Sequence, residues 1–118
     1  MKTETQLRAE VYNAISSIAP TFWLSRPTLE QTFPLMVYTK LDISSDYSFG
    51  IDREAENHIF QIDYYDYPNA IVTLDNNLDA IKTAMESIDY RLIGSQQEFI
   101  HDTLNKVVKV TRWERYNV

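Results

Sequence analysis

The chain has 118 residues and no cysteine, 44% of its residues are hydrophobic, and 17 acidic against 11 basic side chains give it a formal net charge of −6. This composition excludes a disordered chain, a disulfide framework, thiol nucleophiles and zinc sites built on thiolates. No apolar run approaches the roughly 20 residues that span a bilayer, and residues 1–10 hold no apolar secretion core, so we expect one cytoplasmic globular domain over residues 1–118.

The first predicted element is an amphipathic helix. Thr3 and Gln6 have the spacing of a capping box, in which each side chain bonds to the backbone N–H of the other residue. Apolar residues then recur every three or four positions, which predicts a helix from about residue 4 to residue 18. Pro20 ends this helix, because the residue before a proline avoids helical angles.

Two alternating runs predict a long antiparallel hairpin. Residues 21–32 form a connection with a short strand near residues 22–24, and residues 34–43 then alternate with the period of a half-buried strand. A second alternating run covers residues 51–65, after the polar residues 44–50. The positions that share one face are odd in the first run (Leu35, Val37, Thr39, Leu41, Ile43) and even in the second run (His58, Phe60, Ile62, Tyr64).

The clearest predicted element is a second helix over about residues 69–88. Its apolar residues are spaced alternately by three and four, which places them on one stripe of a helix. Pro68 stands near the start, where its missing N–H costs nothing. The stripe consists of Ile71, Leu74, Leu78, Ile81, Met85 and Ile88.

The C-terminal part predicts two further strands. A short strand over residues 90–93 ends at Gly94, a polar connection follows over residues 95–103, and residues 104–116 form a long terminal strand. The elements therefore come in the order α-β-β-β-α-β-β. Helices and strands that are segregated in this way favour the α+β class, with an antiparallel β-sheet, a long hairpin and two helices packed on one face.

Acidic and basic residues are unevenly distributed along the chain. Residues 42–66 carry seven acidic and one basic side chain, whereas residues 104–118 carry four basic and one acidic. Either a solvated acidic loop lies beside a basic strand of the same sheet, or the two are complementary patches on neighbouring subunits that steer a head-to-tail contact. The candidate interface or lumen residues are Asp46, Tyr47, Phe49, Asp52, Arg53, Glu54, Glu56, Lys106, Lys109, Arg112 and Arg115.

Catalytic and ligand-binding patterns are weak. His58 and His101 could act as general bases, and Asp63, Asp66 or Asp102 could supply a carboxylate partner, but there is no nucleophile elbow, glycine-rich loop or His-x-x-x-His pair. We therefore expect His58 to be a sheet residue and His101 a loop residue, with no catalytic group and no cofactor. The acidic residues of the hairpin lack the spacing of a calcium loop, so no metal site is predicted. Tyr64, Tyr65 and Tyr67 alternate with acidic residues, which favours a core or a subunit interface over nucleic acid.

Nearly the whole chain resembles a family of phage proteins. A proline-led strand (FPLMVYTKLD), a long second strand (HIFQIDYYDY), a helix that ends in IKTAMESIDYRLI and a terminal strand (NKVVKVTRWERYNV) follow an N-terminal helix and a connection. In length, element order and strand positions, this pattern is similar to the tail terminator, or tail completion, proteins of long-tailed phages and prophages, which include tail-to-head joining proteins.

The resemblance implies a structural virion protein rather than an enzyme. It implies a homo-oligomeric ring, expected to be a hexamer, that caps the tail tube and docks to the head connector or a head-completion protein. DNA would pass through the ring without specific binding, and no membrane is involved. The protein would reside at the head–tail interface of the virion and in the host cytoplasm during assembly. The alternatives are another neck component, such as a head-closure or connector protein, and a small α+β enzyme or ligand-binding domain that uses His58 with Asp63.

Overall fold

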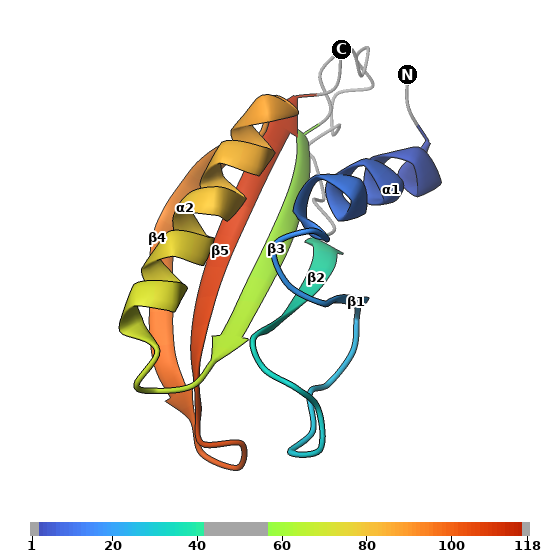
Figure 1. The fold of residues 1–118 in the computed structure, drawn as a ribbon. Coiled ribbons are helices and arrows are strands. Elements are labelled where there is room, and N and C mark those ends of the chain that lie inside the picture. The colour runs from blue at the N-terminus through green and yellow to red at the C-terminus, as the bar shows by residue number, and fades with distance from the viewer. Residues whose placement is uncertain (1–2, 42–56, 117–118) are drawn as a thin grey trace.

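The computed structural model describes residues 3–41 and 57–116, which form two helices and one five-stranded sheet (Figure 1). The α+β class and the predicted order of elements are both confirmed. In chain order the elements are α1 (Glu4–Ile15), β1 (Thr21–Trp23), β2 (Leu35–Leu41), β3 (Asn57–Asp66), α2 (Ile71–Ser87), β4 (Arg91–His101) and β5 (Lys106–Tyr116).

The strands lie in the order β1-β2-β3-β5-β4, so β1 and β4 are the two edges of the sheet. The predicted hairpin of β2 and β3 is confirmed, and β3 with β5 and β4 with β5 are antiparallel as well. However, β1 is parallel to β2, so the sheet is mixed and not purely antiparallel as predicted. The connection between β1 and β2 returns the chain to the starting end of β1, which a parallel neighbour requires.

The capping box at the start of α1 is confirmed. The Gln6 backbone N–H donates to the Thr3 hydroxyl oxygen at 3.1 Å, and the Thr3 backbone N–H donates to the Gln6 side-chain oxygen at 2.9 Å. The helix ends at Ile15, three residues before the predicted end. There the backbone tightens into a turn in which the Ile18 N–H donates to the Ile15 carbonyl, three residues earlier.

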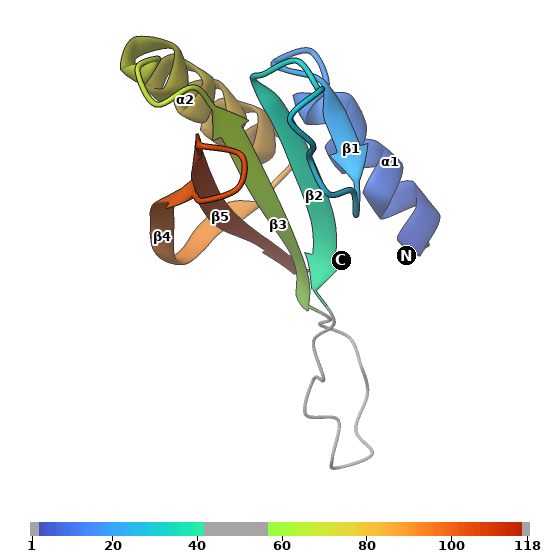
Figure 2. The ribbon, with the colours of Figure 1, turned by 90° about the horizontal axis from the view of Figure 1, so that it is seen from below.

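Both helices pack on the same face of the sheet, called here the helix face (Figure 2). The even residues of β3 alternate into the core as predicted, and Phe60, Ile62 and Tyr64 are fully buried. Directly paired residues of neighbouring strands share a face, so Trp113 of β5, opposite Phe60, also lies on the helix face. The helices contribute Leu7, Val11 and Ile15 of α1 and Leu74, Ile81 and Met85 of α2.

The prediction for the faces of β2 is wrong. Its even residues Met36 and Tyr38 belong to the main core, whereas the odd residues Leu35 and Val37 belong to a second, small cluster on the far face of the sheet. Phe33, just before β2, packs into this second cluster. The start of β2 is therefore buried on both faces, and its sequence alternation did not reveal which face was the main one.

The prediction that a strand ends at Gly94 is also wrong, because β4 continues to His101. Ile93 pairs with Arg112 and Gln97 with Val110, so three residues of β4 lie opposite one residue of β5. Gly94 has a φ of 67° and thus marks a bulge rather than an end. The insertion of two extra residues preserves the alternation of faces, because side chains in a strand repeat with a period of two.

Candidate functional site

His58 and Asp63 do not form a catalytic pair. They are five positions apart in β3, so His58 lies on the helix face and Asp63 on the far face. Burial raises the pKa of the Asp63 carboxyl, against the opposing effects of the Gln61 amide, which donates to it at 3.1 Å, and of the Arg112 guanidinium. His58 is a buried sheet residue, as predicted.

The other histidine and its neighbour lie where β4 meets the turn to β5. The prediction that His101 is a loop residue is wrong, because His101 is the last residue of β4. Its Nδ1 accepts a hydrogen bond from the Leu104 backbone N–H at 3.2 Å. Asp102 is exposed in the same turn. This hydrogen bond satisfies a backbone donor in the connection between β4 and β5, which is a structural role.

A buried chain of hydrogen bonds connects α2 to the end of β3. The Tyr64 hydroxyl donates to Oδ2 of Asp66 at 2.8 Å and accepts from Nδ2 of Asn77 at 2.6 Å. The other carboxylate oxygen of Asp66 accepts from the Tyr67 backbone N–H at 2.7 Å. Burial is the largest of the effects that raise the pKa of Tyr64. Because Asp66 is almost fully buried and hydrogen-bonded within the fold, it serves the packing of α2.

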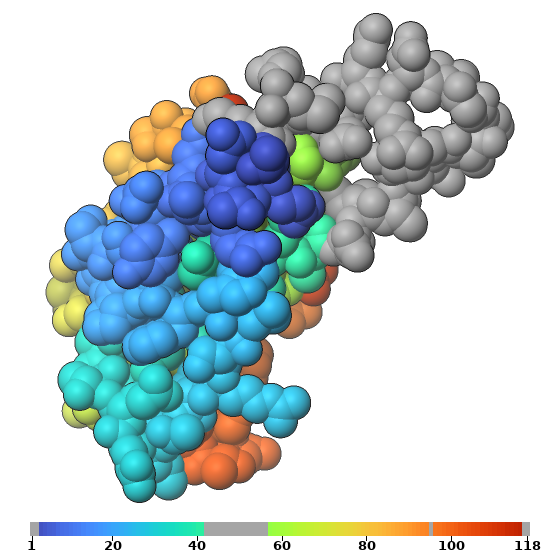
Figure 3. All heavy atoms as spheres, turned by 90° about the vertical axis from the view of Figure 1, so that its right-hand side faces the viewer, coloured from blue at the N-terminus to red at the C-terminus, as the bar shows by residue number. Residues whose placement is uncertain are grey.

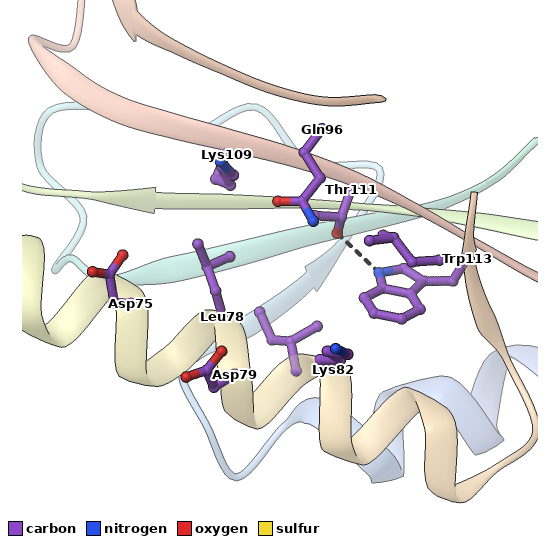
Figure 4. A pocket seen from close by; sticks show the side chains of 10 residues that line it. Asp75, Leu78, Asp79, Lys82, Gln96, Lys109, Thr111 and Trp113 are labelled. Atoms are coloured by element: carbon purple, nitrogen blue, oxygen red, sulfur yellow. Dashed lines mark hydrogen bonds between the residues drawn. The ribbon is translucent and has the colours of Figure 1, made fainter. Parts of the chain in front are cut away.

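A groove with a cavity volume of about 360 Å³ lies between α2 and the β4–β5 pair (Figure 4). Asp75, Asp79 and Lys82 project from α2 on one side, and Gln96 and Lys109 lie on the sheet side. The remaining lining residues are Leu78, Ile81, Leu92, Thr111 and Trp113.

The polar atoms at the base of the groove are already bonded within the fold. The Thr111 hydroxyl accepts from the Trp113 indole N–H at 2.9 Å and donates to the Ile62 carbonyl at 3.3 Å. Lys109 lies 3.5 Å from the Glu98 carboxylate. Within residues 3–41 and 57–116, no three histidine or acidic side chains converge into a group that could hold a metal ion. The groove therefore offers an apolar floor with a charged rim, which suits a binding surface.

A second hollow of about 270 Å³ continues the groove toward the start of α2, with Asp75 lining both. Its apolar wall includes Tyr67 and Ile71, and Glu98 and Val107 line it from the sheet. Sequence analysis did not identify either hollow, because both depend on how α2 lies over β4 and β5.

The four basic candidates of β5 do not form one patch. Successive members are three positions apart, whereas side chains of a strand alternate between its two faces at every residue. Lys109 and Arg115 therefore lie on the helix face, and Lys106 and Arg112 lie on the far face. Each of the four has a partner within the fold. On the helix face, Arg115 forms an ion pair with Glu10 of α1 at 2.8 Å, and Lys109 lies beside Glu98.

The two far-face cations contact aromatic and polar side chains. Arg112 donates to the Gln61 side-chain oxygen at 3.0 Å. The Lys106 ammonium lies 4.9 Å from the Phe33 ring centre and 5.1 Å from that of Tyr67, and it donates to the Leu104 carbonyl. The seven acidic-hairpin candidates, Asp46, Tyr47, Phe49, Asp52, Arg53, Glu54 and Glu56, lie outside the described residues.

The structure also exposes apolar residues that sequence analysis missed. One group lies on α1, on β1 and in the connection after β1, and the other lies at the start of α2 and the end of β4. The available signal was weak: Leu24 and Leu29 stand in a segment without periodicity, and Val72 is an apolar residue beside the predicted stripe of α2.

Comparison with known proteins does not assign the chain to a family. A scan against models of protein families finds no match, and a search of curated proteins finds none either. In the described part of the chain, no helix is both long and apolar enough to cross a membrane.

Proposed function

We propose that this chain is a structural virion protein of a long-tailed phage or prophage, a tail terminator or tail-to-head joining subunit. Several copies form a ring, expected to be a hexamer, that caps the tail tube and docks to the head connector. The observation that carries this proposal is the order and packing of the elements: α-β-β-β-α-β-β, with both helices on one face of the sheet. This is the order on which the resemblance to tail terminator proteins rests.

The charge of the chain is consistent with a ring around DNA. Residues 42–56 join the neighbouring strands β2 and β3 and contain five acidic residues and one arginine, a net charge of −4. Fixed negative charge at a lumen would repel the phosphates of passing DNA and prevent it from sticking. The candidate residues for this role are Asp46, Asp52, Glu54 and Glu56.

The test is to mix the purified protein with tail tubes of its own phage. Negative-stain images are expected to show a ring at the end of each tube, and added protein is expected to stop further polymerisation of tube subunits. A protein that leaves tube growth and tube ends unchanged would contradict the proposal. Binding to isolated connectors but not to tubes would instead favour a head-closure or connector protein.

A further inference from the structure

Eight of the ten large apolar side chains that are exposed in the described residues fall into two groups on opposite sides of the molecule. The β1 surface consists of Tyr12, Phe22, Leu24 and Leu29, and the β4 surface consists of Tyr67, Ile71, Val72 and Ile100. The other two are Phe99, which lies on the far face opposite Val108, and Tyr116 at the end of β5. Figure 1 shows β1 on one side of the molecule and α2 with β4 on the other, in keeping with their places at the two edges of the sheet. Figure 3 views the side formed by α1, β1 and the connection after β1.

Leu24 is the most informative residue of the β1 surface. Its side chain is 64% exposed, and its φ of 52° lies in the left-handed region, which a leucine rarely adopts. The Leu24 backbone N–H donates to the Tyr38 carbonyl at 3.3 Å, so this conformation closes the end of β1. Glycine or asparagine would close it with less strain, and burial does not explain a leucine here. Its side chain is therefore suited to a contact outside the subunit.

The β4 surface surrounds a hollow. Ile71 and Val72 are 65% and 73% exposed, and Ile71 and Tyr67 line the cavity of about 270 Å³ at the start of α2. Ile100 lies beside it, because it pairs with Val107, which lines the same cavity. Exposed apolar residues that gather around a hollow are typical of an interaction site.

The charged groups around the two surfaces have opposite signs. Arg8 lies 4.3 Å from the ring centre of Trp23 in β1, and Arg26 and Glu30 in the connection after β1 cancel each other, which leaves an excess of one positive charge. Asp75, Asp79 and Lys82 line the groove that continues the β4 surface. The Glu98–Lys109 ion pair there is neutral, and Lys106 and Asp66, which both contact Tyr67, cancel each other, so this side has an excess of one negative charge. The two surfaces are thus complementary in charge as well as apolar.

We propose that the β4 surface of one copy receives the β1 surface of a second copy, with Leu24 seated at the hollow beside Ile71 and Val72. Two different surfaces at opposite edges make a heterologous contact, and repetition of such a contact closes a ring where the rotation allows it. This inference deepens the proposed function and rests on it, since it names the contact that would build the ring.

The contact can be tested by cross-linking, because the natural chain has no cysteine. Leu24→Cys and Val72→Cys are prepared as single variants of different tagged mass, mixed, and treated with a flexible bismaleimide. The mixed 24–72 product is expected to exceed either self-product at least fivefold. Thr83→Cys, three turns along α2 from Val72, replaces Val72→Cys in the control mixture and should give only background. Predominant 24–24 or 72–72 products, or a 24–72 yield no greater than the control, would overturn the proposal.

Substitutions separate a role in assembly from a role in folding. Leu24→Asn is expected to leave the thermal midpoint equal or higher, because asparagine tolerates a positive φ, and to weaken self-association at least tenfold by sedimentation. Val72→Lys is expected to weaken it equally, whereas Thr83→Lys should not. A mixture of Leu24→Asn and Val72→Lys retains one intact surface on each partner and should form heterodimers but no rings.

The outcomes also separate this contact from the proposed function. If the natural protein caps tail tubes while both variants assemble normally, the contact is wrong and the proposed function stands. If the 24–72 product forms but the protein neither caps tail tubes nor stops their growth, the contact stands and the proposed function fails. A natural protein that stays monomeric at its highest soluble concentration and also on tubes would contradict both.

Discussion

The hydroxyl group of Tyr64 bonds two other side chains. It donates to the buried Asp66 carboxylate and accepts from Asn77, so it links the last residue of β3 with the middle of α2. A buried carboxylate oxygen that loses its donor costs more than the hydrogen bond itself contributes, because the oxygen cannot regain water.

Tyr64→Phe is therefore expected to lower the free energy of unfolding by about 1–3 kcal/mol, because it leaves an oxygen of Asp66 without its donor. Urea denaturation at neutral pH measures the change. Tyr65→Phe is the matched control, because Tyr65 is the next residue of β3, on the far face, and its hydroxyl has no hydrogen bond among the described residues. We expect the control to change the free energy by less than about 0.5 kcal/mol. Equal effects of both substitutions would contradict this account.

Because the pKa of Asp63 is raised, we expect the stability of the protein to depend on pH. Burial raises its pKa in the folded protein above the ordinary value of 3.8, so the folded state binds this proton more tightly than the unfolded chain does. Ionisation of Asp63 thus reduces stability as the pH rises from 3.8 through the raised pKa, and the full cost is present at neutral pH.

Asp63→Asn is accordingly expected to raise the denaturation midpoint at pH 7, since the amide has no charge to bury. The gain should shrink toward zero below pH 3.8, where the natural carboxyl is neutral as well. Asp79→Asn, on the exposed side of α2, is the control and should change the midpoint little at either pH. A midpoint that falls at pH 7 in the Asp63 variant would show that the charge stabilises the fold.

At the scale of elements, the bulge in β4 is the feature on which the groove depends. It adds two residues to β4 opposite β5 and lets the strand continue to His101, which brings Glu98 and Ile100 to the side of α2. Gly94 supplies the positive φ that the bulge requires, and a Cβ atom at this position would meet no other atom within 4 Å. Only the backbone conformation, and not the space around it, therefore requires glycine.

Gly94→Ala is expected to lower the free energy of unfolding by about 1–2 kcal/mol, the cost of a left-handed conformation for a residue with a Cβ atom. Gly94→Asn should cost less, because asparagine adopts this conformation more readily than alanine. Thermal denaturation of both variants is the measurement. A larger loss for asparagine than for alanine would mean that lack of space, rather than the backbone angle, selects glycine here.

At the scale of the whole molecule, residues 42–56 between β2 and β3 contribute −4 of the formal net charge of −6. Replacement of Asp52, Glu54 and Glu56 by lysine would bring the formal net charge to zero. If the proposed function is right, capping of tail tubes or infectivity should fall at least tenfold. The two core clusters and the pairing of β2 with β3 are formed by residues outside this segment, so the denaturation midpoint should change little.

The matched control keeps the charge and changes the shapes of the three side chains: Asp52→Glu, Glu54→Asp and Glu56→Asp. It should cap tubes and support infection as the natural protein does. Normal infectivity of the lysine variant would remove this acidic segment from the mechanism. Equal defects in both variants would mean that the shapes of these side chains, rather than their charges, matter.

Prediction from sequence succeeded where the deciding interactions are local. The capping box of Thr3 and Gln6, the stripe of α2 from Leu74 to Ile88 and the alternation of β3 all depend on residues within a few positions of one another. Only Ile71, the first residue of the predicted stripe, is wrong, because it is 65% exposed. The predicted end of a strand at Gly94 failed because a glycine with positive φ serves an end and a bulge equally well, and only pairing with β5 distinguishes them.

The sequence by itself determined the class of the fold, the order of its elements and the absence of any thiol chemistry, since these follow from local periodicity and composition. Only the tertiary structure decided that β1 runs parallel to β2, that His58 and Asp63 lie on opposite faces, and that the four cations of β5 are divided between the two faces. It also placed β1, which Leu24 follows, on one side of the molecule and α2, which carries Val72, with β4 on the other (Figure 1). These facts depend on register and strand order, which are set by contacts between residues far apart in the chain.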